Sequence, residues 1–146
     1  MKNISPSAHK NIFLLVCMCL AVLLIIAVVS AGRDEAMHRD LYRQYEAANR
    51  LFEERQFGEP YAIYKRLSEL YSDSYILELK MAVCAMNMEM WDEAVGHSRR
   101  TIELYPMLSK DMDFMEAFIY CLKELGEHEA ANSVEEYFYG FASMQG

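Results

Sequence analysis

Side chains that could act as acids, bases or metal ligands are thinly spread along this 146-residue sequence. Two segments place carboxylates beside a histidine, DEAMHRD (34–40) and GEHEAA (126–131). General acid–base catalysis needs such groups within hydrogen-bond reach, and metal motifs need ligands at fixed spacings. No such spacing appears here, and these segments are typical of solvated helix surfaces. The four histidines are His9, His38, His97 and His128.

Sulfur and indole groups offer the other possible chemistry. Cys84 and Cys121 are isolated, outside any C-x-x-C arrangement. Both fall on apolar helix faces, so we expect buried free thiols, with a disulfide between them as the alternative. Trp91 lies in the methionine-rich segment MNMEMW (86–91), which could be a ligand box or a packing motif. The sequence therefore predicts no enzyme, no cofactor and no metal site.

A run of 20 residues from Ile12 to Ala31 contains no charge and no proline. As a helix it is ~30 Å long, the thickness of a bilayer core. We therefore predict a short tail over 1–11, a transmembrane helix over 12–31 and a separate domain over 32–146. A cleaved signal peptide is the alternative, because Val29, Ser30 and Ala31 resemble a cleavage site.

The charge of the chain limits its partners. All 22 acidic residues follow the apolar run, together with 12 of the 14 basic residues. A phosphate backbone would be repelled, and no basic stripe interleaved with aromatic residues compensates. We therefore expect a protein partner, with no nucleic acid and no binding to anionic lipid surfaces.

Beyond residue 34 the apolar residues recur at three- and four-residue spacing, which predicts helices throughout. Turn formers and helix caps divide this part into three helical hairpins, at about 40–71, 74–105 and 111–140. The hairpins repeat at an offset of 34, because Phe57 aligns with Trp91 and Tyr71 with Tyr105. A third copy follows at 36 or 37, depending on whether Ala130 or Ala131 matches Ala94.

Helix–turn–helix units of 34 residues resemble the tetratricopeptide repeat (TPR) family. The departures are Pro60 at a small position, Ser72 where the second copy has Pro106, and the bulky Ile119. The resemblance implies an all-α, right-handed solenoid of about three antiparallel hairpins behind the predicted membrane helix. It also makes Trp91 a packing residue at a hairpin turn. The matching residues are Ala48, Leu51, Phe57, Tyr64 and Leu67, then Met81, Ala82, Ala85, Trp91, Ala94 and Pro106, then Phe118, Leu122, Gly126, Ala131 and Phe138.

The resemblance further implies a concave groove, lined by the first helix of each hairpin, that binds a peptide. An apolar centre and an acidic end suit an amphipathic peptide carrying some positive charge. The alternative is that Leu79, Val83 and Met86 belong to the core. The groove positions are Tyr42, Tyr45, Asn49 and Phe52 in the first copy, Leu79, Val83, Met86 and Asn87 in the second, and Asp113, Glu116, Tyr120 and Lys123 in the third.

Together these features are similar to small N-terminally anchored repeat proteins of bacterial inner membranes. We therefore expect a single-pass protein with its N-terminus inside and its repeat domain outside the cytoplasm, since no acidic residue precedes the run. The expected role is that of an adaptor or assembly factor for a membrane-associated complex. The alternative is a permanent structural subunit without an exchangeable ligand.

Overall fold

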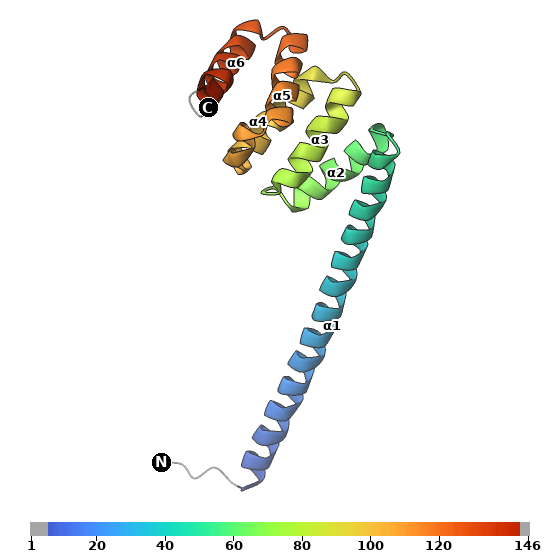
Figure 1. The fold of residues 1–146 in the computed structure, drawn as a ribbon. Coiled ribbons are helices and arrows are strands. Elements are labelled where there is room, and N and C mark those ends of the chain that lie inside the picture. The colour runs from blue at the N-terminus through green and yellow to red at the C-terminus, as the bar shows by residue number, and fades with distance from the viewer. Residues whose placement is uncertain (1–5, 144–146) are drawn as a thin grey trace. The chain divides into compact units, whose positions relative to one another are not determined.

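The computed structural model describes the backbone of residues 6–143 and the side chains of residues 15–28 and 35–140. Within these residues the chain has six α-helices, one 3-10 helix and no strand (Figure 1). The all-α fold predicted from the sequence is therefore confirmed. The elements are α1 (Pro6–Glu53), α2 (Gly58–Leu70), α3 (Tyr75–Asn87), α4 (Trp91–Leu104), η1 (Pro106–Lys110), α5 (Met112–Leu125) and α6 (His128–Ser143).

The chain divides into two compact units, Met1–Tyr42 and Arg43–Gly146. In the first unit, the large apolar side chains of α1 between Leu15 and Val28 are exposed. No helix among the described residues combines the length and the apolarity that crossing a membrane requires. The transmembrane helix predicted over 12–31 is thus unsupported. Its two ends, 12–14 and 29–31, lie outside the residues whose side chains are described.

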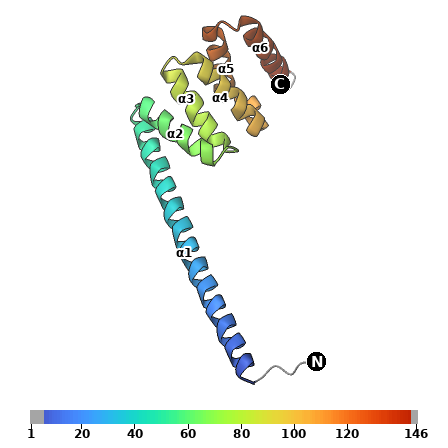
Figure 2. The same ribbon diagram turned by 180° about the vertical axis from the view of Figure 1, so that it is seen from behind.

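In the second unit each helix from α2 to α6 packs against its neighbours in sequence, as both views show (Figures 1 and 2). The core contains Ala85, Val95, Phe118, Leu122 and Phe138, drawn from α3, α4, α5 and α6. Each of these helices is apolar on one face only, so stacking against the next hairpin is what buries that face.

The three hairpin turns share one backbone conformation. Arg55, Glu89 and Gly126 follow the first helix of each hairpin and have φ angles of 60°, 59° and 89°. This left-handed conformation ends a helix and favours glycine, yet only the third turn has one. Each turn is closed by the same 6→1 hydrogen bond, which is the Schellman pattern. The bonds run from Gln56 N to Leu51 O, Met90 N to Ala85 O and Glu127 N to Leu122 O, all at 2.9 Å.

These turns fix the register of the third copy. Glu89 follows Arg55 by 34 residues, and Gly126 follows Glu89 by 37 residues. With the offset of 37, Ala131 takes the place of Ala94, and both are fully buried at 0% exposure. Ala130 is only half-buried. The structure therefore selects Ala131 as the small residue that lets the two helices of the last hairpin approach.

Two positions singled out in the sequence have clear packing roles. Trp91 is the first residue of α4 and packs against the buried core, so its assignment as a packing residue is confirmed. Pro60 is fully buried and lies in the first turn of α2, where a missing N–H breaks no helical hydrogen bond. The helix begins at Gly58 with Phe57 at the N-cap, so neither Gly58 nor Glu59 caps it as expected.

Candidate functional site

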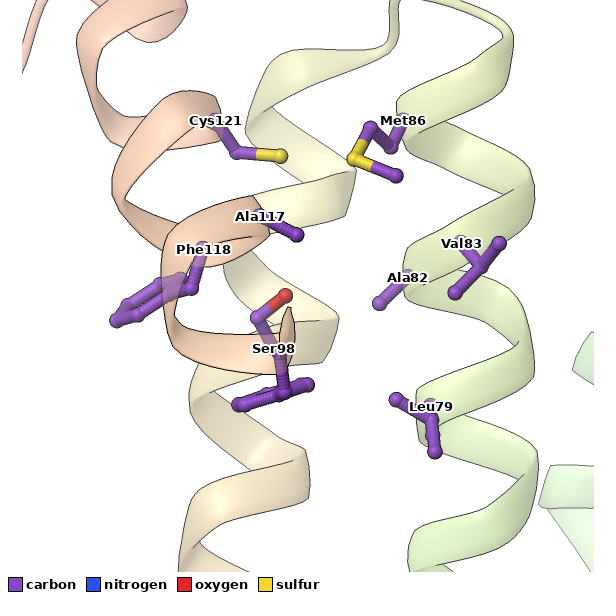
Figure 3. A pocket seen from close by; sticks show the side chains of 9 residues that line it. Leu79, Ala82, Val83, Met86, Ser98, Ala117, Phe118 and Cys121 are labelled. Atoms are coloured by element: carbon purple, nitrogen blue, oxygen red, sulfur yellow. The ribbon is translucent and has the colours of Figure 1, made fainter. Parts of the chain in front are cut away.

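An apolar hollow of about 30 Å³ lies between α3 and α5, with α4 behind it (Figure 3). From α3 the side chains of Leu79, Val83 and Met86 line one side, and α5 supplies Ala117 and Cys121 opposite them. Ser98 contributes the one hydroxyl group of the lining. The volume is close to that of a single water molecule in the liquid, ~30 Å³. The hollow therefore has room for one small apolar group of a partner.

Three of the predicted second-copy groove residues, Leu79, Val83 and Met86, thus meet at this hollow. They are half-buried, so part of each side chain is accessible. Asn87 is exposed at the end of α3, where its side-chain amide donates a hydrogen bond to the Val83 carbonyl at 2.8 Å. The sequence pattern did not select the α5 side of the hollow, because its groove positions on α5 point further out.

The first-copy residues are engaged in contacts within the chain. Tyr64 donates a hydrogen bond to Asn49 Oδ1 at 2.8 Å, and its ring lies 6.1 Å from that of Tyr45. The ring of Phe52 lies 4.2 Å below the Lys80 ammonium group, a cation–π contact. These contacts attach the end of α1 to α2 and α3. Tyr42 is 64% exposed and belongs to the other compact unit.

The third-copy residues form an acidic corner on α5. Tyr120 is 49% exposed and lies edge-on to Trp91, with ring centroids 5.7 Å apart. The charge of Glu124, with some burial, raises the pKa of Tyr120. Glu116 accepts a hydrogen bond from the Tyr139 hydroxyl at 3.4 Å. Lys123 pairs with Glu135 at 2.8 Å, so its charge is compensated within the last hairpin.

A polar chain across three helices was not foreseen from the sequence. His97 on α4 contacts Glu78 on α3 through Nδ1 at 2.7 Å and the Tyr61 hydroxyl on α2 through Nε2 at 3.2 Å. Burial and then the charges of Glu93 and Glu78 raise the pKa of Tyr61, which opposes formation of a phenolate nucleophile. The arrangement is therefore a structural link. Sequence separations of 19 and 36 residues carry no local signal for it.

The two cysteines of the repeat unit behave as expected. Cys84 and Cys121 are buried free thiols, which confirms that prediction over a disulfide. Burial raises the pKa of Cys84 to about 11 and also raises the pKa of Cys121. Both thiols are thus held in the unreactive neutral form.

Comparison with known families follows from this helical array. A family model described as coatomer epsilon subunit matches residues 50–138, which is more than half of the sequence. The chain belongs to the coatomer epsilon subunit family. This is a helical-repeat, TPR-like family of structural subunits. No individual curated protein matches the chain.

Membership of the coatomer epsilon family corrects one prediction. The assignment to a bacterial inner membrane, with the repeat domain outside the cytoplasm, is wrong, because coatomer epsilon is a subunit of a eukaryotic cytosolic vesicle coat. The prediction failed because a helix that is apolar on all sides requires apolar surroundings without identifying them. The expectation of a protein partner within a complex agrees with the family.

Proposed function

We propose that this chain is a protein-interaction subunit of a multiprotein complex and holds a helix or extended peptide of its partner in the groove between α3 and α5. The observation that carries the proposal is the apolar hollow, where Leu79, Val83 and Met86 stay partly accessible in the middle of the repeat array. An amphipathic partner helix binds such a groove through its apolar face.

Two forms of this function differ in whether the partner exchanges. An adaptor would bind several partners in turn, and a permanent subunit would hold one. Membership of a family of structural subunits favours the permanent form. The apolar lining of the hollow also favours it, because obligate interfaces are more apolar than transient ones.

Site-specific photo-crosslinking in cells tests the proposal. A benzoylphenylalanine replaces Met86 at the hollow, and a matched control variant carries it in place of the exposed Lys65 on α2. We expect the Met86 probe to give a discrete, high-yield protein adduct that the Lys65 probe does not give. Equal adducts from both positions, or none from Met86, would contradict binding in the groove.

The number and yield of the adducts separate the two forms. A single adduct that survives high salt and co-elutes with a complex of fixed composition indicates a permanent subunit. Several adducts at low yield, each reduced by overexpression of another partner, indicate an adaptor. A subunit bound stoichiometrically but crosslinked only through Lys65 would place the interface on the other face of the array.

A further inference from the structure

The groove between α3 and α5 is electrostatically one-sided. Asp113, Glu116 and Glu124 are exposed on α5, and none of them forms an ion pair among the described residues. Across the groove the one charged residue of α3 besides Glu78 is Lys80, whose ammonium group lies over the Phe52 ring. The accessible charge beside the hollow is therefore negative and has no internal counterion on α5 except Lys123, which pairs with Glu135.

An aromatic ring lies within this negative field. Tyr120 is held edge-on by Trp91, with an interplanar angle of 85°, and is half-exposed. The negative charges of Glu124 and Glu89 act on its hydroxyl. A tyrosine face attracts cations, and carboxylates beside it add Coulomb attraction. This combination is suited to a guanidinium or ammonium group rather than to an apolar side chain.

The hollow and this acidic corner are neighbours along one helix. Ala117 lines the hollow and Tyr120 is three residues further on, ~4.5 Å along the helix axis at 1.5 Å per residue. Residues three or four apart on a partner helix are spaced by one turn as well, with Cβ atoms ~5–6 Å apart. One helical turn of a partner can therefore present an apolar side chain to the hollow and a basic side chain to Tyr120.

We propose that the partner segment is a basic amphipathic helix that places a small apolar side chain in the hollow between α3 and α5 and an arginine or lysine one turn away, between Tyr120, Glu116 and Glu124. The inference rests on the proposed function, since it specifies the chemistry of the segment that the groove holds. The charge complementarity of the acidic corner determines the choice of occupant. An acidic or purely apolar helix would leave these carboxylates without counterions.

Synthetic helices provide the probe. Fluorescent alanine-rich helical peptides carry one leucine and, four residues later, arginine, glutamine or glutamate, and their binding to the full chain is followed by anisotropy at low salt. We expect the arginine peptide to bind most tightly and the glutamate peptide most weakly. The double variant Glu116→Gln/Glu124→Gln should weaken the arginine peptide by about two- to five-fold per carboxylate and leave the glutamine peptide unchanged.

Two controls separate failure of this inference from failure of the proposed function. Glu129→Gln removes an exposed charge on α6 outside the groove and should not change binding. Val83→Asn makes the hollow polar and should weaken all three peptides, with the circular dichroism spectrum unchanged as a check of folding. If Val83→Asn acts but the double variant does not, the basic character is refuted and groove binding stands.

The remaining outcomes are also decisive. If Val83→Asn leaves the arginine peptide unaffected, the groove itself is not the binding site and both proposals fail. Absence of saturable binding of the arginine peptide up to about 1 mM, a free energy near −4 kcal/mol, overturns the inference. A concentration-dependent dimer in sedimentation that Val83→Asn abolishes would make a second copy of this chain the occupant instead.

Discussion

The left-handed turns make a prediction that isolates backbone conformation from packing. Gly126 has φ of 89°, and a Cβ added there meets nothing within 4 Å. Gly96 lies inside α4 without a positive φ, and a Cβ added there also meets nothing within 4 Å. Replacing each glycine by alanine therefore adds one methyl group to open space in both cases. The two variants differ only in the backbone conformation that the alanine must adopt.

The expected effects have opposite sign. Gly96→Ala should increase the free energy of unfolding by about 0.5–1 kcal/mol, because alanine is the better residue in a helix interior. Gly126→Ala should lower it by about 1–2 kcal/mol, because an L-residue in the left-handed region is strained. Each kcal/mol moves the midpoint by roughly 3–6 °C in a chain of this size.

Urea and thermal unfolding, followed by circular dichroism at 222 nm, measure both changes against the unsubstituted chain. The urea dependence of the free energy should stay the same in both variants, since neither changes the surface exposed on unfolding. A shift of the same sign in the two variants would refute the reasoning, because it would mean that the conformation at Gly126 does not control the effect. Glu89→Gly, at the equivalent turn, should be stabilising for the same reason.

Three further predictions concern buried groups. Tyr64→Phe should destabilise the chain by about 1–2 kcal/mol in urea unfolding, because Asn49 loses the hydroxyl that donates to it, and a double-mutant cycle with Asn49→Ala should show coupling between the two residues. Labelling with a maleimide at pH 7.5 should leave Cys84 and Cys121 unmodified until urea is added, whereas early modification of Cys84 would contradict its burial. Stability should fall as the pH rises from about 9 to about 11, because the folded chain keeps the Cys84 thiol protonated while the unfolded chain releases that proton; Cys84→Ala should reduce this slope in chemical unfolding at both pH values.

The sequence alone determined the helical class and the repeat. Apolar residues at three- and four-residue spacing reflect the need of each helix to bury one face, and the 34-residue offset follows from equal helix lengths and equal turns. Leu79, Val83 and Met86 were found in this way, because a repeat pattern places equivalent positions on equivalent faces. The pattern also assigned Trp91 to packing.

Tertiary structure alone decided which groups meet across helices. Tyr61, Glu78 and His97 contact one another only because α2, α3 and α4 pack side by side, and no local rule links residues that far apart. The same packing engages Asn49 and Phe52 within the chain and leaves Leu79, Val83 and Met86 partly accessible. The register of the third hairpin likewise required the φ angles of its turn, since Ala130 and Ala131 are identical in type and differ only in burial. Spacing in sequence fixes the face on which a residue lies, and packing fixes whether another side chain already covers it.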